Sequence, residues 1–249
     1  MKNYDDKFFE YVNSGSINSA RTVLPFIYKN LTINSVLDIG CGQGAWLSVW
    51  QELGIKNFIG IDGSYVDSAH LLIPKETFVS ADLAEGFSIN KQFDLIQCLE
   101  VAEHLPLSKA KQFVAAIAAH GKTVMFSAAP KGQGGDHHVN EQDYDFWRSL
   151  FRAHDYFAFD CIRPEISQAP AVEPWYRYNT FLYVHKDSLN QLPKKLRSTR
   201  VADGTRLRDI SPFPYKLRKL LVRLLPLALA TKVAKTKKAI VARSRRNNG

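Results

Sequence analysis

The stretch "VLDIGCGQGAW", residues 36–46, decides the fold of this chain. A short apolar run at residues 36–39 is followed directly by Gly40, Gly42 and Gly44, and then by a segment of helical character. Alternating glycines allow a sharp turn between a strand and a helix, and they let a ligand approach the backbone where no Cβ intervenes. The first turn of the helix offers free N–H donors to an anionic group. The stretch therefore predicts a strand–turn–helix unit that binds a ligand at its turn.

The segments after this unit repeat the alternation of strand and helix, which predicts a parallel sheet with helices on both faces. No helix of 10–15 residues separates the last two predicted strands, so we expect that pair to be antiparallel. Pro25 is expected to kink or end the first helix. The predicted helices are 16–30, 45–54, 107–121 and 141–155, and the further predicted strands are 57–62, 77–82, 93–100, 122–129, 156–164 and 178–185.

The charge is distributed unevenly along the 249 residues. Residues 193–249 hold 17 Lys/Arg and 2 Asp/Glu, a net charge of +15, and the preceding residues carry −6. This asymmetry predicts a domain over residues 1–190 and a basic extension over 191–249 that meets an anionic partner. The three cysteines lie far apart in apolar runs, and the N-terminus has no apolar signal segment, so a cytoplasmic location is expected.

Acidic residues stand at the ends of two further predicted strands. Asp62 follows Asp38 by 24 residues, a spacing that suits hydrogen bonding to ribose hydroxyls. Asp82 ends the next strand, where it can receive an adenine amino group. Three such sites at successive strand ends match the edge at which open α/β sheets bind ligands.

These motifs resemble those of class I S-adenosylmethionine-dependent methyltransferases. The resemblance covers about residues 16–186 and rests on "VLDIGCGQGAW", "GIDGS", "VSADL" and "FDLIQCLEVAEHLP". It implies a Rossmann-like fold with a seven-stranded, mostly parallel sheet that ends in an antiparallel hairpin. It also implies that S-adenosylmethionine is the cofactor. It implies that the glycine turn surrounds the methionine part of the cofactor, that Asp38 orients the cofactor's amino group and that Asp62 holds the ribose. The residues that it assigns to cofactor binding are Asp38, Gly40, Cys41, Gly42, Gly44, Asp62, Asp82, Leu83 and Glu100.

"CLEVAEHLP", residues 98–106, places Glu100, Glu103 and His104 within five positions of one another. Repulsion between the two carboxylates is relieved by a proton or by a cation. Oxygen ligands with an imidazole suit Mg²⁺ or Mn²⁺.

The E-x-x-E-H pattern also resembles two metal-dependent branches of the family, the ubiquinone-pathway O-methyltransferases and the small-RNA 3′-terminal 2′-O-methyltransferases. The second branch adds a histidine after the fifth strand, where this chain has "GDHHVNEQ". His138 matches better than His137 by its spacing to the following acid. The implied metal ligands are Glu100, Glu103, His104 and His138. In the metal-free alternative, His138 or His104 is the general base, with Glu103 beside it.

The extension begins with an amphipathic segment. On a helical wheel Leu217, Leu220, Leu221 and Leu224 share one face, and basic residues flank them. A helix that lies in a membrane interface has this pattern, and its basic residues attract anionic lipids. Nucleic acid is attracted by the same charge, although the extension has few aromatic residues for stacking. A helix docked on the body is the third alternative.

The sequence as a whole predicts a cytoplasmic methyltransferase that acts on a hydroxyl of a saccharide or lipid-linked glycan and is peripherally associated with the membrane. The enzymatic alternative is an RNA 2′-O-methyltransferase. The other alternative is a non-catalytic, cofactor-binding scaffold that the basic extension recruits to a partner. The acceptor and the oligomeric state do not follow from the sequence.

Overall fold

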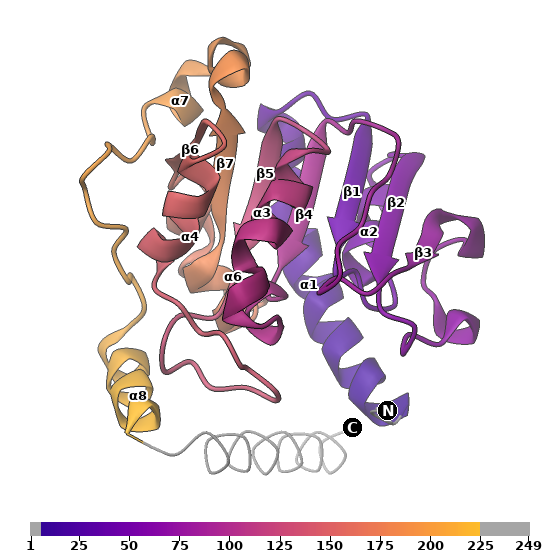
Figure 1. The fold of residues 1–249 in the computed structure, drawn as a ribbon, viewed down its shortest axis with the longest axis horizontal. Coiled ribbons are helices and arrows are strands. Elements are labelled where there is room, and N and C mark those ends of the chain that lie inside the picture. Colours follow the sequence, from indigo (N-terminus) through magenta and orange to yellow (C-terminus); the bar gives the residue numbers. More distant parts are fainter. Residues whose placement is uncertain (1–5, 225–249) are drawn as a thin grey trace.

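The sheet at the centre of the molecule has seven strands in the order β3-β2-β1-β4-β5-β7-β6 (Figure 1). The structure is a computed structural model that describes residues 6–224, with side chains described from residue 13 onward. Strands β1 to β5 pair in parallel, and β7 is antiparallel to both β5 and β6. The predicted mostly parallel sheet with a terminal antiparallel hairpin is confirmed. The strands are β1 (Ser35–Ile39), β2 (Asn57–Asp62), β3 (Phe78–Ser80), β4 (Leu95–Leu99), β5 (Thr123–Ser127), β6 (Tyr156–Phe159) and β7 (Phe181–His185).

The central strands β1 and β4 are buried along their whole length. Parallel strands covered on both faces carry continuous apolar runs, which is why these segments are recognisable in the sequence. The carboxyl ends of β1, β2, β4 and β5 meet at the same edge of the sheet (Figure 1). The turns that follow these strands therefore gather at one edge.

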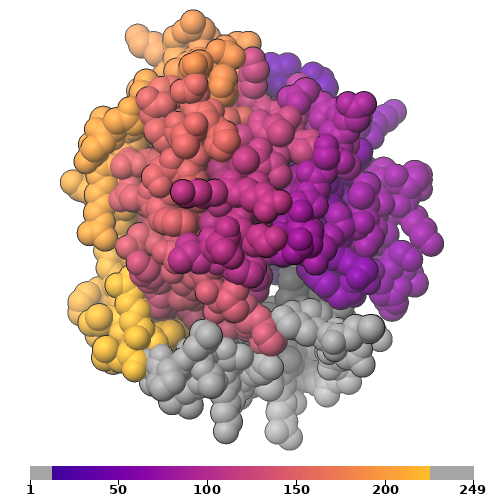
Figure 2. All heavy atoms as spheres, viewed as in Figure 1, coloured from indigo at the N-terminus to yellow at the C-terminus, as the bar shows by residue number. Residues whose placement is uncertain are grey.

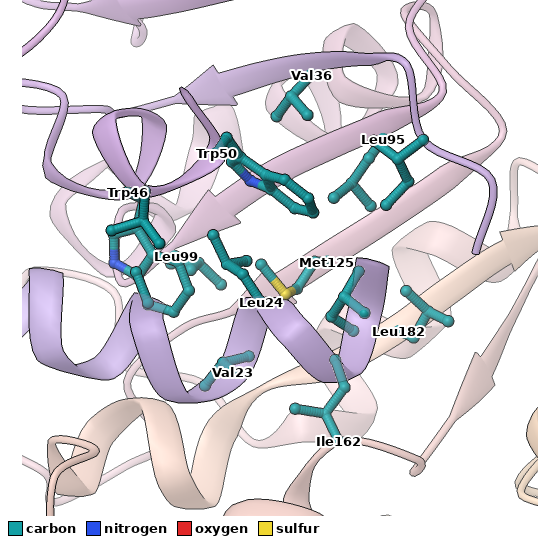
Figure 3. Packing of buried hydrophobic residues seen from close by; sticks show 14 of the residues in the cluster. Val23, Leu24, Val36, Trp46, Trp50, Leu95, Leu99, Met125, Ile162 and Leu182 are labelled. Atoms are coloured by element: carbon teal, nitrogen blue, oxygen red, sulfur yellow. The ribbon is translucent and has the colours of Figure 1, made fainter. Parts of the chain in front are cut away.

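Helices cover the two faces of the sheet in separate layers. Leu24 of α1 and Trp50 of α2 pack on one face with Met125 and Leu182 (Figure 3). Residues of α3 and α4 pack on the other face around Phe126. The helices are α1 (Asp6–Asn30), α2 (Ala45–Glu52), α3 (Ala110–Ala118), α4 (Tyr144–Arg152), α5 (Arg163–Ile166), α6 (Pro174–Asn179), α7 (Lys194–Arg197) and α8 (Phe213–Arg223). Short 3₁₀ turns are η1 (Ser68–His70), η2 (Lys75–Thr77), η3 (Ala102–His104), η4 (Leu107–Lys109) and η5 (Lys186–Gln191).

The first helix differs from its prediction in length and in the effect of Pro25. It begins ten residues before the predicted start at residue 16 and continues through Pro25 to Asn30. Pro25 and Arg21, whose carbonyl loses its helical partner, both lie on the exposed side of α1. Val23 and Ile27 are buried against the sheet. Packing of this apolar side therefore outweighs the hydrogen bond lost at Pro25.

The chain after β7 stays attached to the body for about 25 residues. Leu192 and Leu196 belong to one core cluster and Leu207 to the other. Arg200 forms an antiparallel bridge with Phe159 at the end of β6, and the chain then runs along the outside to α8 (Figure 1). The predicted division at residue 190 therefore falls within a packed segment, and the separation of two functional parts stays a prediction. None of the helices within residues 6–224 has the length and apolar composition needed to cross a membrane.

Candidate active site

The glycine turn after β1 forms the centre of the candidate cofactor site. Gly40, Gly42 and Gly44 all have positive φ, at 79°, 56° and 86°, which residues with a Cβ rarely adopt. A Cβ on Gly40 would lie 2.2 Å from Cγ2 of Val101. A Cβ on Gly42 would meet no atom of the described residues within 4 Å. The turn thus needs Gly40 for its own packing, whereas the described residues leave open space beside Gly42.

Asp62, the last residue of β2, connects this turn to the end of the neighbouring strand. Its carboxylate accepts hydrogen bonds from the N–H groups of Gly42 at 2.6 Å and Gly63 at 2.7 Å, and from the hydroxyl of Tyr65. Burial raises the pKa of Asp62, although these three hydrogen bonds oppose the rise. The carboxylate is therefore held beside the open space at Gly42.

Asp38 lies one strand inward and is almost fully buried. Burial raises its pKa to about 7, and the charge of Asp62 adds to the effect. Cys41 is buried as well, and burial raises the pKa of its thiol well above the usual range. Its N–H donates to the carbonyl of Ile61 at 3.1 Å. Cys41 therefore contributes its backbone to the turn, and its thiol is not a nucleophile.

The segment with Asp82 and Leu83 follows β3 at the same edge. The N–H of Ala81 donates to the carbonyl of Asp62 at 2.8 Å, so this segment is fastened to the end of β2. Asp82 is exposed and accepts a hydrogen bond from the N–H of Ala84 at 2.9 Å. Leu83 is buried. The structure thus brings the third strand end next to the second, as the adenine assignment requires.

Glu100, directly after β4, is held in a strained backbone conformation. Its φ is 58°, and its N–H donates to the carbonyl of Ser127 at 3.0 Å and to the hydroxyl oxygen at 3.1 Å. Its carboxylate accepts hydrogen bonds from the side-chain amides of Gln133 at 2.6 Å and Asn179 at 3.1 Å. Burial raises the pKa of Glu100, and the two amides oppose the rise. Both carboxylate oxygens are therefore committed to amide donors.

Glu103 lies three residues further on, in η3, and differs from Glu100 in that no side-chain amide bonds to its carboxylate in the described part of the chain. Its carboxylate is completely buried, and no hydrogen bond of normal geometry from the described part of the chain reaches either oxygen. Burial raises the pKa of Glu103 well above its usual range, and the charge of Glu100 raises it further. The backbone N–H groups of Glu103 and Ala129 oppose the rise in the pKa, and the Glu100 carboxyl lies within hydrogen-bonding reach of Glu103. A buried carboxyl group beside another one is costly unless it binds a proton or a cation.

His104 and His138 stand beside this carboxylate. One ligand atom from each of Glu103, His104 and His138 lies within 4.8 Å of the others. The two imidazole rings are in edge contact, with ring centroids 4.9 Å apart. One carboxylate and two imidazoles at this separation suit a divalent cation. Glu100 is outside this group, and so is His137.

The glycine-rich loop after β5 carries His138 to the cluster. Glu141 accepts a hydrogen bond from each of the N–H groups of Gly132 and Gly134 at 2.7 Å, and it pairs with Nδ1 of His138 at 2.8 Å. The N–H groups of residues 139 and 140 donate to the carbonyl of Glu103 at 2.9 and 3.0 Å. The loop is thereby fastened both to itself and to the turn that holds Glu103 and His104.

Several polar residues of this edge were not expected from the sequence. Ser127, Gln133 and Asn179 hold Glu100, and Asn13 of α1 donates to Gln43 in the glycine turn at 2.6 Å. Gln133 lies in the glycine-rich loop, so the unusual composition of that loop could have indicated that its polar residues belong to the site. Asn179 is 79 residues from Glu100, and no local pattern indicates it.

The comparison with protein families agrees with this geometry. A family model described as "Methyltransferase domain" matches residues 15–163, which is more than half of the chain. The comparison with curated proteins finds no match.

Solved methyltransferases share the fold at low sequence identity. DesVI of Streptomyces venezuelae is 14% identical with a TM-score of 0.55, and the match covers 74% of this chain and 100% of that one. Magnesium protoporphyrin IX methyltransferase of Synechocystis PCC 6803, solved with bound S-adenosylmethionine, is 18% identical with a TM-score of 0.52, covering 75% and 86%. An S-adenosylmethionine-dependent methyltransferase of Clostridium acetobutylicum ATCC 824 is 14% identical with a TM-score of 0.51, covering 68% and 91%. With the family match and the glycine turn, these observations show that the chain belongs to the class I S-adenosylmethionine-dependent methyltransferases.

Proposed function

We propose that this methyltransferase transfers a methyl group to a hydroxyl of a saccharide or lipid-linked glycan at the cytoplasmic face of an anionic membrane. The observation that supports O-methylation is the fully buried Glu103 carboxylate, which lies beside His104 and His138. This group stands at the sheet edge where the cofactor site also lies. A hydroxyl needs to lose its proton during methyl transfer, so an acceptor-activating site is expected there.

The cofactor residues keep their predicted assignments. The open space at Gly42, next to the carboxylate of Asp62, supports the assignment of the glycine turn to the methionine part and of Asp62 to the ribose. The carboxylate of Glu100 accepts hydrogen bonds from the amides of Gln133 and Asn179. These bonds support a role for Glu100 in shaping the cofactor region rather than in binding a metal.

The residues that would hold a divalent cation are Glu103, His104 and His138. Mg²⁺ or Mn²⁺ bound there would lower the pKa of the acceptor hydroxyl and orient its oxygen. The pairing of Nδ1 of His138 with Glu141 favours the tautomer with its proton on Nδ1, so Nε2 keeps its lone pair. That lone pair suits a metal ligand. It equally suits the general base of a metal-free mechanism, which takes the hydroxyl proton directly.

The membrane assignment rests on α8. Its apolar side faces solvent, with Leu220 and Leu221 more than half exposed and Phe213 and Leu224 each 75% exposed. Exposed basic residues such as Lys216 and Arg223 lie on the same helix. This combination supports insertion into the interface of an anionic leaflet. The second basic stretch of the extension lies outside the described residues.

The charge of the extension also supports the RNA alternative. A small RNA methyltransferase, HEN1, has a similar fold, with 16% identity and a TM-score of 0.51, covering 75% of this chain and 27% of that one. At 16% sequence identity, the similarity between this chain and HEN1 concerns the fold alone. The scaffold alternative is less favoured, because the glycine turn and its carboxylates are in place.

The test is a methyl-transfer assay with labelled S-adenosylmethionine and separate lipid-linked glycan, free saccharide and RNA fractions. We expect label in the glycan fraction, loss of turnover in chelator with cofactor binding retained, and recovery on adding Mg²⁺ or Mn²⁺. The double variant Glu103→Gln, His138→Ala should not recover, whereas the control His137→Ala should behave as wild type. Turnover that is indifferent to chelator but lost in His138→Ala would establish the base mechanism instead. Label found only in RNA would establish the alternative acceptor.

A further inference from the structure

A cavity of about 420 Å³ lies between α8 and the body of the protein, away from the glycine turn. Its walls come from the start of the loop after β5, the start of α4, the segment 206–209 and α8. Figure 2 shows α8, in yellow, at the surface on this side of the molecule. Sites for small molecules have volumes of roughly 300–1,000 Å³, so the cavity has room for a compact ligand.

The walls of this cavity are strongly basic. Its lining contains three acidic residues and the basic residues Lys131, Arg206, Arg208, Lys216, Lys219 and Arg223. Each acidic residue already has cationic partners. Asp209 pairs with the buried Lys219, and Asp145 pairs with Arg148 at 3.0 Å.

Asp143 is shared between two looser partners, Lys131 at 3.7 Å and Arg223 at 3.9 Å. The other three cations, Arg206, Arg208 and Lys216, are exposed and form no ion pair with any residue in the range 13–224. The cavity therefore has uncompensated positive charge on two of its walls, the 206–209 segment and α8. An anion with charge at two centres matches this arrangement better than a single small ion.

We propose that this cavity binds the diphosphate group of the methyl acceptor. Two arginines offer planar forks of N–H donors to phosphate oxygens, and Lys216 adds a point charge from the facing helix. Lys131 lies 3.7 Å from its ion-pair partner Asp143, so its ammonium group is able to turn toward a bound phosphate. Nη2 of Arg223 lies 3.9 Å from Asp143, so this end of the guanidinium is also available while Nε stays bonded to the chain.

The cavity is joined to the glycine-rich loop after β5 by direct contacts. Arg223 donates to the carbonyl of Lys131 at 2.9 Å, and Arg218 donates to the carbonyl of Gln133 at 3.0 Å. The side chain of Gln133 holds Glu100, and the same loop carries His138. A diphosphate held between α8 and this loop would anchor the acceptor beside the site of transfer. The identity of the ligand as the acceptor rests on the proposed function, whereas diphosphate binding itself does not require methyl transfer.

The test uses the full chain, calorimetry and inorganic pyrophosphate at about 0.15 M salt, where long-range attraction to the extension is screened. Arg208→Ala with Lys216→Ala removes one cation from each wall. The control Lys194→Ala with Arg197→Ala removes the same charge from exposed positions of α7. We expect the first pair to weaken binding by about tenfold or more and the control to leave it nearly unchanged. Equal affinities in the two double variants would overturn the site. Unchanged S-adenosylmethionine binding shows that the variants are folded.

Two competitors distinguish the sources of the diphosphate. Geranyl diphosphate represents a lipid-linked acceptor, and UDP-glucose represents a nucleotide-linked one. Displacement of pyrophosphate by either compound supports an acceptor site and identifies its class. If neither displaces it, the cavity binds only free anions and the assignment to the acceptor is wrong. Because no methyl transfer is measured, this result is independent of the assay for the proposed function.

Discussion

At the scale of single residues, Gly40 and Gly42 lie two positions apart but are glycines for different reasons. Gly40 has a positive φ and is in close contact with Val101, so its lack of a side chain serves the fold. Gly42 has a positive φ beside space that the described residues leave open, so no packing contact in this part of the chain explains its lack of a side chain. The sequence motif presents both residues in the same way, and only the structure distinguishes them.

We expect alanine at both positions to lower stability, more at Gly40 than at Gly42, and alanine at Gly42 to weaken cofactor binding as well. Gly40→Ala should lower the free energy of unfolding by about 2–4 kcal/mol, because backbone strain and a clash with Val101 add. Gly42→Ala should cost about 1–2 kcal/mol from backbone strain alone, yet weaken S-adenosylmethionine binding by about tenfold or more. Urea unfolding and calorimetry measure the two quantities. If Gly42→Ala binds the cofactor as wild type does, the space beside Gly42 is not the cofactor site.

Asp38 should make stability depend on pH near neutrality. Its ordinary pKa of 3.8 is raised to about 7 by burial, so the folded protein favours the protonated form. The associated stabilisation is complete below pH 3.8 and is lost as pH rises through 7. We expect Asp38→Asn to gain up to about 4 kcal/mol relative to wild type between pH 4 and pH 8.

Urea unfolding of both proteins across this pH range measures the difference, with the exposed Asp67→Asn as the control. A constant difference between wild type and Asp38→Asn would show that Asp38 is ionised throughout. If Asp38 binds the amino group of the cofactor as predicted, wild type should also bind S-adenosylmethionine more tightly at pH 8 than at pH 6.

At the scale of elements, α8 has the reverse of the usual orientation for a surface helix. A helix on a globular body normally buries its apolar side. Here Lys219 is buried and Arg218 bonds to the loop after β5, whereas the leucines face solvent. The amphipathic helix lies where it was predicted. It is docked on the body through its polar side, and its apolar side is exposed. The docked polar side leaves the leucine side available to a membrane.

We expect Leu220→Ser with Leu221→Ser to reduce sedimentation with anionic vesicles by about tenfold or more, because two half-exposed leucines no longer enter the interface. The matched control is Leu72→Ser with Leu107→Ser, which changes two similarly exposed leucines on the body. Neither pair should alter thermal stability much. Equal sedimentation of the two double variants would exclude α8 as the membrane contact.

At the scale of the whole molecule, Arg163 joins the extension to the sheet. Its side chain is 1% exposed and pairs with Asp160 through Nε at 2.8 Å and Nη2 at 2.6 Å. Nη1 donates to the carbonyls of Tyr178 at 3.1 Å and Arg208 at 2.9 Å, and the guanidinium lies 3.9 Å from the ring centre of Phe181. One side chain thus contacts the strand β7, the end of α6 and the segment that lines the basic cavity.

We expect Arg163→Met to lower the free energy of unfolding by about 3 kcal/mol, because Asp160 and two carbonyls lose a buried partner. Amide exchange of residues 200–211 should rise in the variant, and in wild type these residues should exchange together with the body. The exposed Arg197→Met is the control. If residues 191–211 unfold separately from the body in wild type, the division predicted at residue 190 is supported and the role given to Arg163 is wrong.

The convergence of Glu100, Glu103, His104 and His138 was implied only by the resemblance to metal-dependent methyltransferases. Local patterns in the sequence predicted the order of strands and helices, the glycine turn and the carboxylates at the strand ends. These features were predictable because a buried parallel strand needs a continuous apolar run, and a tight turn needs glycine. The choice of His138 over His137 also followed from spacing, and the structure places His138 beside Glu103. The roles of these residues in catalysis stay predictions.

Only the tertiary structure decided which partners these residues have. The hydrogen bond of Glu100 with the amide of Asn179, the complete burial of Glu103 and the continuation of α1 through Pro25 all depend on segments distant in the sequence. Contacts between segments distant in the sequence also turn the polar side of α8 inward and form the basic cavity. The spacing of apolar residues in the sequence indicates whether a helix or strand has an apolar side that can be buried. The surface that meets it, and the cost of burying a charge there, are set by the other elements of the fold.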